Sequence, residues 1–343
     1  MSDEKLPVPG SCALCCWWAA NQGAEIRDSE DKICHHPRQT EPWTDDDMPC
    51  NVDGFTPSTA TEVNVPQHTN QGTMDLINEK PVDGPVEILI VTFSKDFEWL
   101  VWALTCARKH LSGFQGITIA HPIHESPKFN SLKDQDWGTR LRLHPYQEWL
   151  GKGFLQHEYK MACADEIVPQ GTKYVLHMDA DCMFKMATTP EHYFYNDKPQ
   201  YIYRTWESLS SPDPHDPTRK VVSDCIMWRE PTSRQLGYES DVYTMCRHPT
   251  VFPIGFYPRY RAHLEKTHHM AADDYFRSGQ SNAWPQDLMD LTAMGQFSWT
   301  YMRENFHWIN CATEEYPKDR LLAFHSHSGL IPDVVKQLES FIA

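Results

Sequence analysis

The first long hydrophobic run of the chain covers residues 87–93, which read E-I-L-I-V-T-F. A nearly continuous apolar run of this length predicts a central strand that is covered on both faces. Apolar residues then recur at helical spacing between 100 and 111, which predicts a helix that opens at 94–96. Residues 117–120 form the next apolar strand. This order of strand, helix and strand predicts parallel pairing with a right-handed crossover, and therefore an α/β fold.

Further along the chain the same reasoning predicts alternating strands and helices. A polar stretch at 134–143 is typical of a surface loop, and 208–218, with three prolines, predicts a mobile loop near a binding site. The remaining elements are helices at 154–167, 258–267 and 289–305 and strands at 174–178, 201–206, 223–228 and 321–324.

The predicted strand at 174–178 ends at two aspartates, Asp179 and Asp181. In an extended chain alternate side chains share a face, so the two carboxylates point the same way. Carboxylate oxygens are the ligands that hard divalent cations prefer. In open α/β sheets, ligands bind beyond the carboxyl ends of the strands, which is where this pair lies.

Composition and charge restrict the class of protein. The 343 residues are 40% hydrophobic and carry a net charge of −16, which argues against binding to a nucleic-acid backbone. The sequence contains no apolar run of transmembrane length and no recognisable signal peptide, so we expect a cytoplasmic protein. The 11 cysteines have no regular spacing, which favours reduced thiols.

Residues 1–84 differ from the rest, with 15 acidic and 5 basic residues, many prolines and no sustained periodicity. They predict an irregular leader, followed by one catalytic domain at 85–343. An alternative for the leader is a structural zinc site, although the spacing of its candidate ligands matches no standard module. Those ligands are Cys12, Cys15, Cys16, Cys34, His35, His36 and Cys50.

The sequence H-M-D-A-D at 177–181 resembles the D-x-D motif of GT-A-fold glycosyltransferases. In that family the motif holds Mn²⁺ or Mg²⁺ against the diphosphate of a nucleotide-sugar. Residues 86–330 resemble a poorly characterised group of these enzymes from microbes, fungi and viruses. The resemblance also rests on the run at 87–93, the Lys160-Met161 helix with Ala164-Asp165, the R-H-P-T-V-F-P stretch at 247–253 and two late histidines.

The resemblance implies a three-layer GT-A fold, Rossmann-like, with a mostly parallel mixed sheet. It implies that Lys160 faces the nucleotide and that a late histidine, His325 or His327, completes the metal site begun by Asp179 and Asp181. Residues Val91, Thr92 and Phe93, at the end of the first strand, are then expected to line the base and ribose pocket.

One position departs from the family pattern. Where the group often carries a glutamate in its late helix, this chain has Gln296. Glutamine cannot accept a proton as a general base, but it can orient an acceptor hydroxyl. Our candidate for the base is Asp287, with Asp290 and Glu304 as alternatives; a retaining or inactive protein is also consistent with this departure. Candidate sugar platforms are Trp206, Trp284 and Trp299.

These features predict a metal-dependent glycosyltransferase. Its donor would be a UDP- or GDP-sugar, and its acceptor a glycan or another hydroxyl compound. The alternative is a GT-A domain that binds a nucleotide or glycan without transfer. A metal-dependent hydrolase is a third hypothesis, which is disfavoured because no H-x-H-x-D or H-E-x-x-H arrangement accompanies the aspartates.

Overall fold

The computed structural model describes residues 86–149, 152–210, 223–246, 249–279, 291–315, 320–324 and 329–342. All of these residues belong to one unit of the chain, Thr73–Ala343. The predicted leader and its candidate zinc ligands lie outside the described residues. So do Asp287, His325 and His327, and most of the predicted loop at 208–218.

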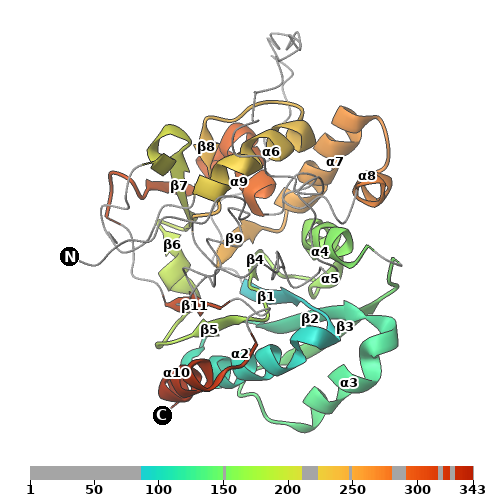
Figure 1. Ribbon diagram of the computed structural model, residues 1–343, viewed down its shortest axis with the longest axis vertical. Coiled ribbons are helices and arrows are strands. Elements are labelled where there is room, and N and C mark those ends of the chain that lie inside the picture. The colour runs from blue at the N-terminus through green and yellow to red at the C-terminus, as the bar shows by residue number, and fades with distance from the viewer. Residues whose placement is uncertain are drawn as a thin grey trace, which may run out of the picture. The chain divides into compact units, whose positions relative to one another are not determined.

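A five-stranded sheet lies at the centre of this unit, with the strand order β3-β2-β1-β4-β9 (Figure 1). The four strands β1 (Val86–Val91), β2 (Gly116–Pro122), β3 (Leu141–Tyr146) and β4 (Tyr174–His177) are mutually parallel. Only β9 (Thr250–Pro253) is antiparallel, to β4. The predicted α/β class with a mostly parallel mixed sheet is confirmed, and it is the arrangement of a GT-A-like, Rossmann-type sheet.

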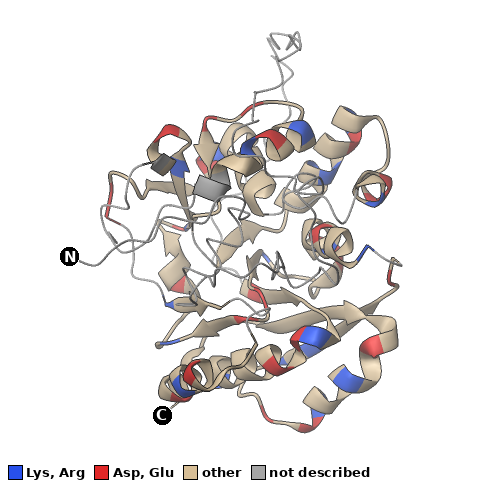
Figure 2. Ribbon diagram, viewed as in Figure 1, with Lys and Arg blue, Asp and Glu red and all other residues tan. Residues whose placement is uncertain are grey.

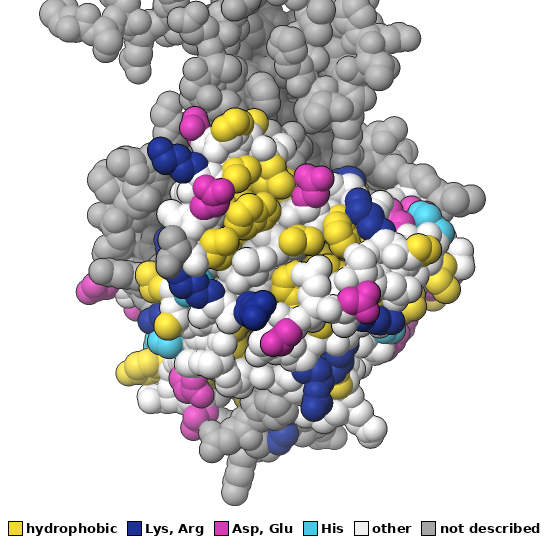
Figure 3. Space-filling view, turned by 90° about the horizontal axis from the view of Figure 1, so that it is seen from below, with side chains coloured by type: hydrophobic (Ala, Val, Ile, Leu, Met, Phe, Trp, Pro, Cys, Tyr) yellow, Lys and Arg dark blue, Asp and Glu magenta, His cyan; other side chains and the backbone are white. Residues whose placement is uncertain are grey.

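Helix α2 (Phe97–His110) follows β1 after the short 3-10 helix η1 (Ser94–Asp96) and covers one face of the sheet. Helices α3 (Ser126–Asn130) and α10 (Pro332–Ile342) lie on the same side (Figure 1). Their apolar side chains form one core with those strand residues that point to this face, such as Ile88 and Ile90. Seen from below, this layer shows hydrophobic side chains interspersed with charged ones (Figure 3).

The opposite face of the sheet packs against a second core, which contains Leu89 and Val91. The predicted helix at 154–167 is divided here into α4 (Gly153–Ala162) and α5 (Ala164–Ile167), with Cys163 between them in a non-helical conformation. This layer also contains α7 (Phe256–His268), α8 (Ala272–Ser278) and α9 (Leu291–Tyr301). In Figure 2 most charged residues lie on the helices and loops rather than on the strands of the sheet.

A smaller sheet has β7 (Lys198–Thr205) at its centre, paired with β6 (Phe194–Tyr195), β8 (Val242–Tyr243) and β10 (His307–Asn310). A separate two-stranded ribbon joins β5 (Cys182–Phe184) antiparallel to β11 (Leu321–Ala323). This ribbon begins directly after the two aspartates.

Three of the sequence predictions for secondary structure are wrong. The polar segment at 134–143 is only partly a loop, because residues from 141 onward form the edge strand β3. Residues 223–228 form a 3-10 helix, η6 (Ser223–Trp228), that leads into α6 (Arg229–Leu236), and not a strand. The long helix at 289–305 ends at Tyr301 and is followed by the separate turn η7 (Arg303–Asn305).

Candidate active site at the carboxyl edge of the sheet

The two aspartates follow the carboxyl end of β4. The Met178 N–H donates to the Leu89 carbonyl at 3.1 Å, which keeps the chain beside β1 just past the strand. A tight turn follows, closed by the Cys182 N–H, which donates to the Asp179 carbonyl at 3.1 Å. Strands β2 and β3 lie on one side of β1, and β4 lies on its other side. The strand order therefore switches direction between β1 and β4. Crevices at such switch points are the usual ligand sites of open α/β sheets.

The turn brings Asp179 and Asp181 together with the Cys182 thiol. One ligand atom from each of the three lies within 4.8 Å of the others, and both aspartates are partly exposed. Burial, together with the two aspartate charges, raises the pKa of Cys182 well above its usual range. The two aspartates each offer a carboxylate oxygen, and the thiol beside them is buried. This donor set fits a hard cation such as Mn²⁺ or Mg²⁺ better than it fits zinc.

The segment that carries the two late histidines starts from the same turn. Strand β11 pairs with β5, and the Phe324 N–H then donates to the Asp181 carbonyl at 2.9 Å. Phe324, the last described residue before His325, therefore lies directly beside the second aspartate. The side chains of His325 and His327 lie outside the described residues, so their role as ligands stays a prediction.

The end of β1 contributes mainly Phe93 to this edge. The side chains of Val91 and Thr92 are buried, and the Thr92 N–H donates to the Ala120 carbonyl at 2.9 Å. Phe93 is half-buried, and a Cβ added to Gly153 would lie 3.5 Å from its ring. Helix α4 therefore begins at the carboxyl edge of the sheet, close to β1.

Lys160 lies on α4, two turns after its start. Helical side chains lean toward the N-terminus of their helix, which here directs Lys160 toward the carboxyl edge. Its Nζ is 5.3 Å from the ring centroid of Tyr146, the last residue of β3, and 5.4 Å from that of Tyr159. Within the described part of the chain Lys160 has no carboxylate partner. Contact between Lys160 and a nucleotide stays a prediction.

The sequence reasoning missed Glu158, which also lies on α4. This side chain is 2% exposed; its Oε1 is 3.4 Å from His157 Nδ1, and its Oε2 has no hydrogen-bond partner. Burial, and secondarily the charge of Asp179, raises the pKa of Glu158 well above its usual range. The signal was present in the sequence, because Glu158 lies three residues from both Leu155 and Met161 on the apolar stripe of the helix.

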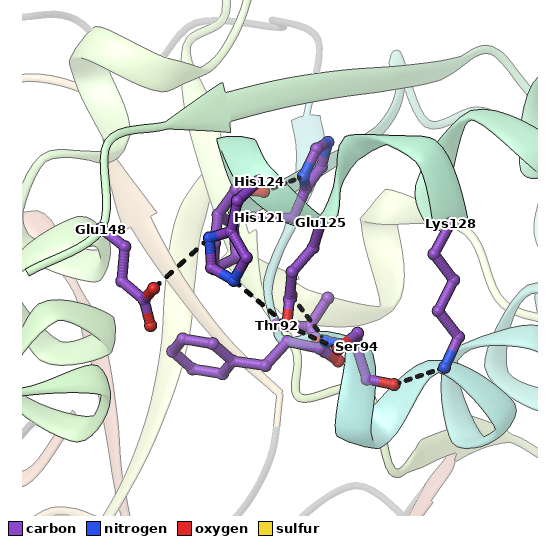
Figure 4. Close-up of polar contacts among 9 residues, drawn as sticks. Thr92, Ser94, His121, His124, Glu125, Lys128 and Glu148 are labelled. Carbon is purple, nitrogen blue, oxygen red and sulfur yellow. Dashed lines mark hydrogen bonds and ion pairs between the residues drawn. The ribbon is translucent and has the colours of Figure 1, made fainter. Parts of the chain in front are cut away.

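A polar network ties the exit of β1 to the exit of β2 (Figure 4). The Ser94 N–H donates to Glu125 Oε2 at 2.7 Å and the Ser94 hydroxyl to Glu125 Oε1 at 2.5 Å. Lys128 Nζ donates to the Ser94 carbonyl at 2.8 Å, and His124 Nδ1 lies 3.3 Å from Glu148 Oε2. An open pocket of about 340 Å³ is lined by Ser94, His124, Glu125, Lys128 and Pro127. The network holds together the segments that follow β1 and β2 at the carboxyl edge of the sheet.

Gln296 lies in the core and not at this edge. It is 1% exposed, and its Nε2 donates to the Val242 carbonyl of β8 at 2.8 Å. The amide thus attaches α9 to β8. Among the alternative acids, Glu304 is exposed in η7, whereas Asp287 and Asp290 lie outside the described residues.

The interpretation of two tryptophans as open sugar platforms is wrong. Trp206 is 5% exposed and Trp299 is 9% exposed. Their indole N–H groups donate to the Ser240 carbonyl and to an Asp241 carboxylate oxygen. The Arg303 guanidinium lies 3.6 Å from the centroid of the Trp299 ring. Trp284 lies outside the described residues.

No protein-family model matches the chain, and no curated protein matches it. The solved structures that resemble the chain include S. aureus TarS and mouse xyloside xylosyltransferase 1, both at low similarity. S. aureus TarS matches over 30% of this chain and 18% of its own, at 10% identity and a TM-score of 0.24. The apo form of mouse xyloside xylosyltransferase 1 matches over 66% of this chain and 86% of its own, at 9% identity and a TM-score of 0.35. Similarity at this level carries no function over to this chain. None of the described helices is long and apolar enough to cross a membrane.

Proposed function

We propose that this protein is a metal-dependent glycosyltransferase that moves a sugar from a nucleoside-diphosphate donor to a hydroxyl acceptor. The observation that carries the proposal is the pair Asp179 and Asp181, which lies at the carboxyl end of β4 where the strand order switches. Two partly exposed carboxylates suit Mn²⁺ or Mg²⁺, which prefer oxygen ligands. An acidic protein can still bind a diphosphate if a cation neutralises it locally.

Each candidate residue at the carboxyl edge then has a specific role. Asp179 and Asp181, with His325 or His327, hold the cation, which when bound neutralises the charge of the leaving nucleoside diphosphate. Lys160 supplies a further positive charge beside the phosphates. Phe93 packs against the nucleoside, and the Ser94–Glu125 network keeps the chain around it in place.

The proton of the acceptor hydroxyl needs a base if the reaction inverts the sugar. We assign this role to Asp287, because Gln296 has no basic group and its amide already bonds to the Val242 carbonyl. The buried position of Gln296 also favours a second candidate function. A domain that lacks the late-helix acid of the resembled group could bind a nucleotide or glycan without transferring sugar.

The test is thermal unfolding of the full chain with UDP, GDP or ADP, each with and without Mn²⁺, for wild type, Asp181→Ala and the control Asp134→Ala. Asp134 is exposed in the turn η3 (Ser131–Asp134), and no ion pair involves it among the described residues. A ligand at about 100 times its Kd adds about 2.7 kcal/mol, or a few degrees in Tm for a protein of this size.

We expect one nucleotide to raise the Tm only with Mn²⁺, in wild type and in Asp134→Ala but not in Asp181→Ala. Transfer from the matching nucleotide-sugars, assayed as release of the nucleoside diphosphate, then separates the transferase from the binding domain. If no nucleotide raises the Tm of wild type, the proposal is wrong.

A further inference from the structure

The junction between α4 and α5 is held by a residue from a distant part of the chain. Helix α4 ends at Ala162, and α5 begins at Ala164, after the non-helical Cys163. The last carbonyl groups of a helix need partners from outside it. The Ala162 carbonyl accepts a hydrogen bond from Arg261 Nη1 at 2.8 Å, and Arg261 lies on α7, 99 residues further along the chain. Helix α7 therefore determines how α4 ends.

The same guanidinium binds the first turn of α5. Arg261 Nη1 donates to Asp165 Oδ1 at 2.6 Å, and Arg261 Nη2 donates to Asp165 Oδ2 at 3.0 Å. Only 14% of the arginine side chain and 17% of the aspartate side chain are exposed, so water screens the pair little. Two parallel bonds from a planar guanidinium fix the geometry of a contact as well as its charge. The contact thus fixes both sides of the break in the helix.

Lys160 lies in the turn of α4 that Arg261 holds. The Lys160 carbonyl accepts from the Cys163 N–H at 3.2 Å, and Ala162 is only two residues away. The Lys160 Nζ lies 5.3 Å from the ring centroid of Tyr146, at the carboxyl end of β3. A rotation or shift of this last turn would therefore move the ammonium group relative to the carboxyl edge.

We propose that Arg261 is a positioning residue for Lys160. Its bonds to Ala162 and Asp165 fix the last turn of α4 and so hold the Lys160 ammonium where it contacts the phosphates of the donor. Arg261 itself does not touch the substrate. The inference rests on the proposed function, because that function assigns Lys160 to the phosphates.

Three substitutions and one control separate positioning from general stability. Arg261→Lys keeps the charge but cannot form the planar fork, whereas Asp165→Asn keeps the shape of the partner but loses its charge and one acceptor. Lys160→Met removes the ammonium group. The control is Tyr260→Phe, also on α7. Tyr260 is 1% exposed, and its hydroxyl accepts a hydrogen bond from Gln235 Nε2 on α6 at 2.8 Å.

The measurement is the Kd for UDP, GDP and ADP, each with Mn²⁺, by titration calorimetry of the full chain, with Tm measured alongside. For the nucleotide that wild type binds, we expect Lys160→Met, Arg261→Lys and Asp165→Asn each to weaken binding by about tenfold, a usual size for coupling within one network. Adding Arg261→Lys to Lys160→Met should cause no further loss, because no ammonium group is left to position. Tyr260→Phe should lower the Tm and leave the Kd unchanged.

Nucleotide binding like that of wild type in both Arg261→Lys and Asp165→Asn overturns the inference. A further tenfold loss when Arg261→Lys is added to Lys160→Met also overturns it, because Arg261 then acts on another group. Both results leave the cation site, and with it the proposed function, intact. If wild type binds none of the three nucleotides, the proposed function and this inference both fail. If Arg261→Lys does not fold, Asp165→Asn decides, alone and combined with Lys160→Met.

Discussion

Two buried glutamates near the central sheet differ in the partners that surround them. At the amino edge, Glu87 of β1 is 0% exposed and accepts hydrogen bonds from the Thr118 hydroxyl and from Arg142 Nη1, both at 2.6 Å. On helix α4, Glu158 is also buried, but its Oε2 has no hydrogen-bond partner and its Oε1 lies 3.4 Å from His157 Nδ1. Burial, and secondarily the charge of Asp179, raises the pKa of Glu158.

The difference lies in the partners of each buried carboxyl group. A buried charge is tolerated where partners satisfy it, as Arg142 and Thr118 do for Glu87. Acids that face one another without a counterion reduce stability, and such arrangements concentrate at functional sites. A cation would relieve this repulsion at the carboxyl edge, whereas the amino edge has no need of one.

Substitution of the aspartates should have the largest effect. With Asp181→Asn we expect transferase activity to fall by about 1,000-fold, because a bound cation contributes several kcal/mol to the transition state and each 1.4 kcal/mol is about tenfold in rate. Release of the nucleoside diphosphate measures the loss. Activity in Asp181→Asn within a few fold of wild type would remove the cation from the mechanism.

A substitution at the amino edge should reduce the stability of the fold rather than the activity. Arg142→Met leaves Glu87 buried without its cation, which costs about 3 kcal/mol at pH 8, where the carboxyl must either stay charged or take up a proton. The loss should be smaller at pH 5, since burial already raises the pKa of Glu87 and protonation removes the unpaired charge. Urea unfolding at the two pH values checks this. An equal loss at both would show that packing, and not charge, is responsible.

A substitution of Gln296 in α9 should have an effect of intermediate size. Gln296→Glu directs a carboxyl group at the Val242 carbonyl in place of the Nε2 donor, and should reduce the free energy of unfolding by about 1–3 kcal/mol. The substitution restores the residue usual in the resembled group, so activity is measured in the same samples. A more active protein of unchanged stability would place residue 296 at the active site and not in the core.

The last expected effect is a change in the pH dependence of stability. A carboxyl whose folded pKa is raised contributes stability that is fully present below the ordinary glutamate pKa of about 4.3 and is lost as the pH rises through the folded pKa. Glu158→Gln removes this loss, at most about 1.4 kcal/mol per pH unit. Unfolding free energies from pH 4 to 8 should therefore fall less steeply in Glu158→Gln than in wild type.

The sequence predicts the parts of this molecule that local pattern determines. The run at 87–93 and the spacing after residue 100 were sufficient to predict β1 and α2, and two aspartates after an apolar strand were sufficient to predict the edge on which they lie. Edge strand β3 was missed because its polar residues are explained only by a distant partner, since Arg142 pairs with Glu87.

Tertiary contacts also determine what the candidate site contains. The pattern of the late helix does not reveal that Gln296 bonds to β8, because Val242 is 54 residues away in the chain. Glu158 is not among the candidate residues that the sequence patterns indicate, although its place on the apolar stripe of α4 already indicates burial. A charged residue on a buried stripe is thus a useful signal for further candidate residues.

The most direct test of the central claim is a titration of the full chain with Mn²⁺, followed by electron paramagnetic resonance, in wild type, Asp179→Asn, Asp181→Asn and the amino-edge control Glu87→Gln. If the carboxyl edge is a cation site, wild type and Glu87→Gln bind one Mn²⁺ per chain, and both aspartate variants lose it. Binding that is absent from wild type, or unchanged in both aspartate variants, would contradict the account.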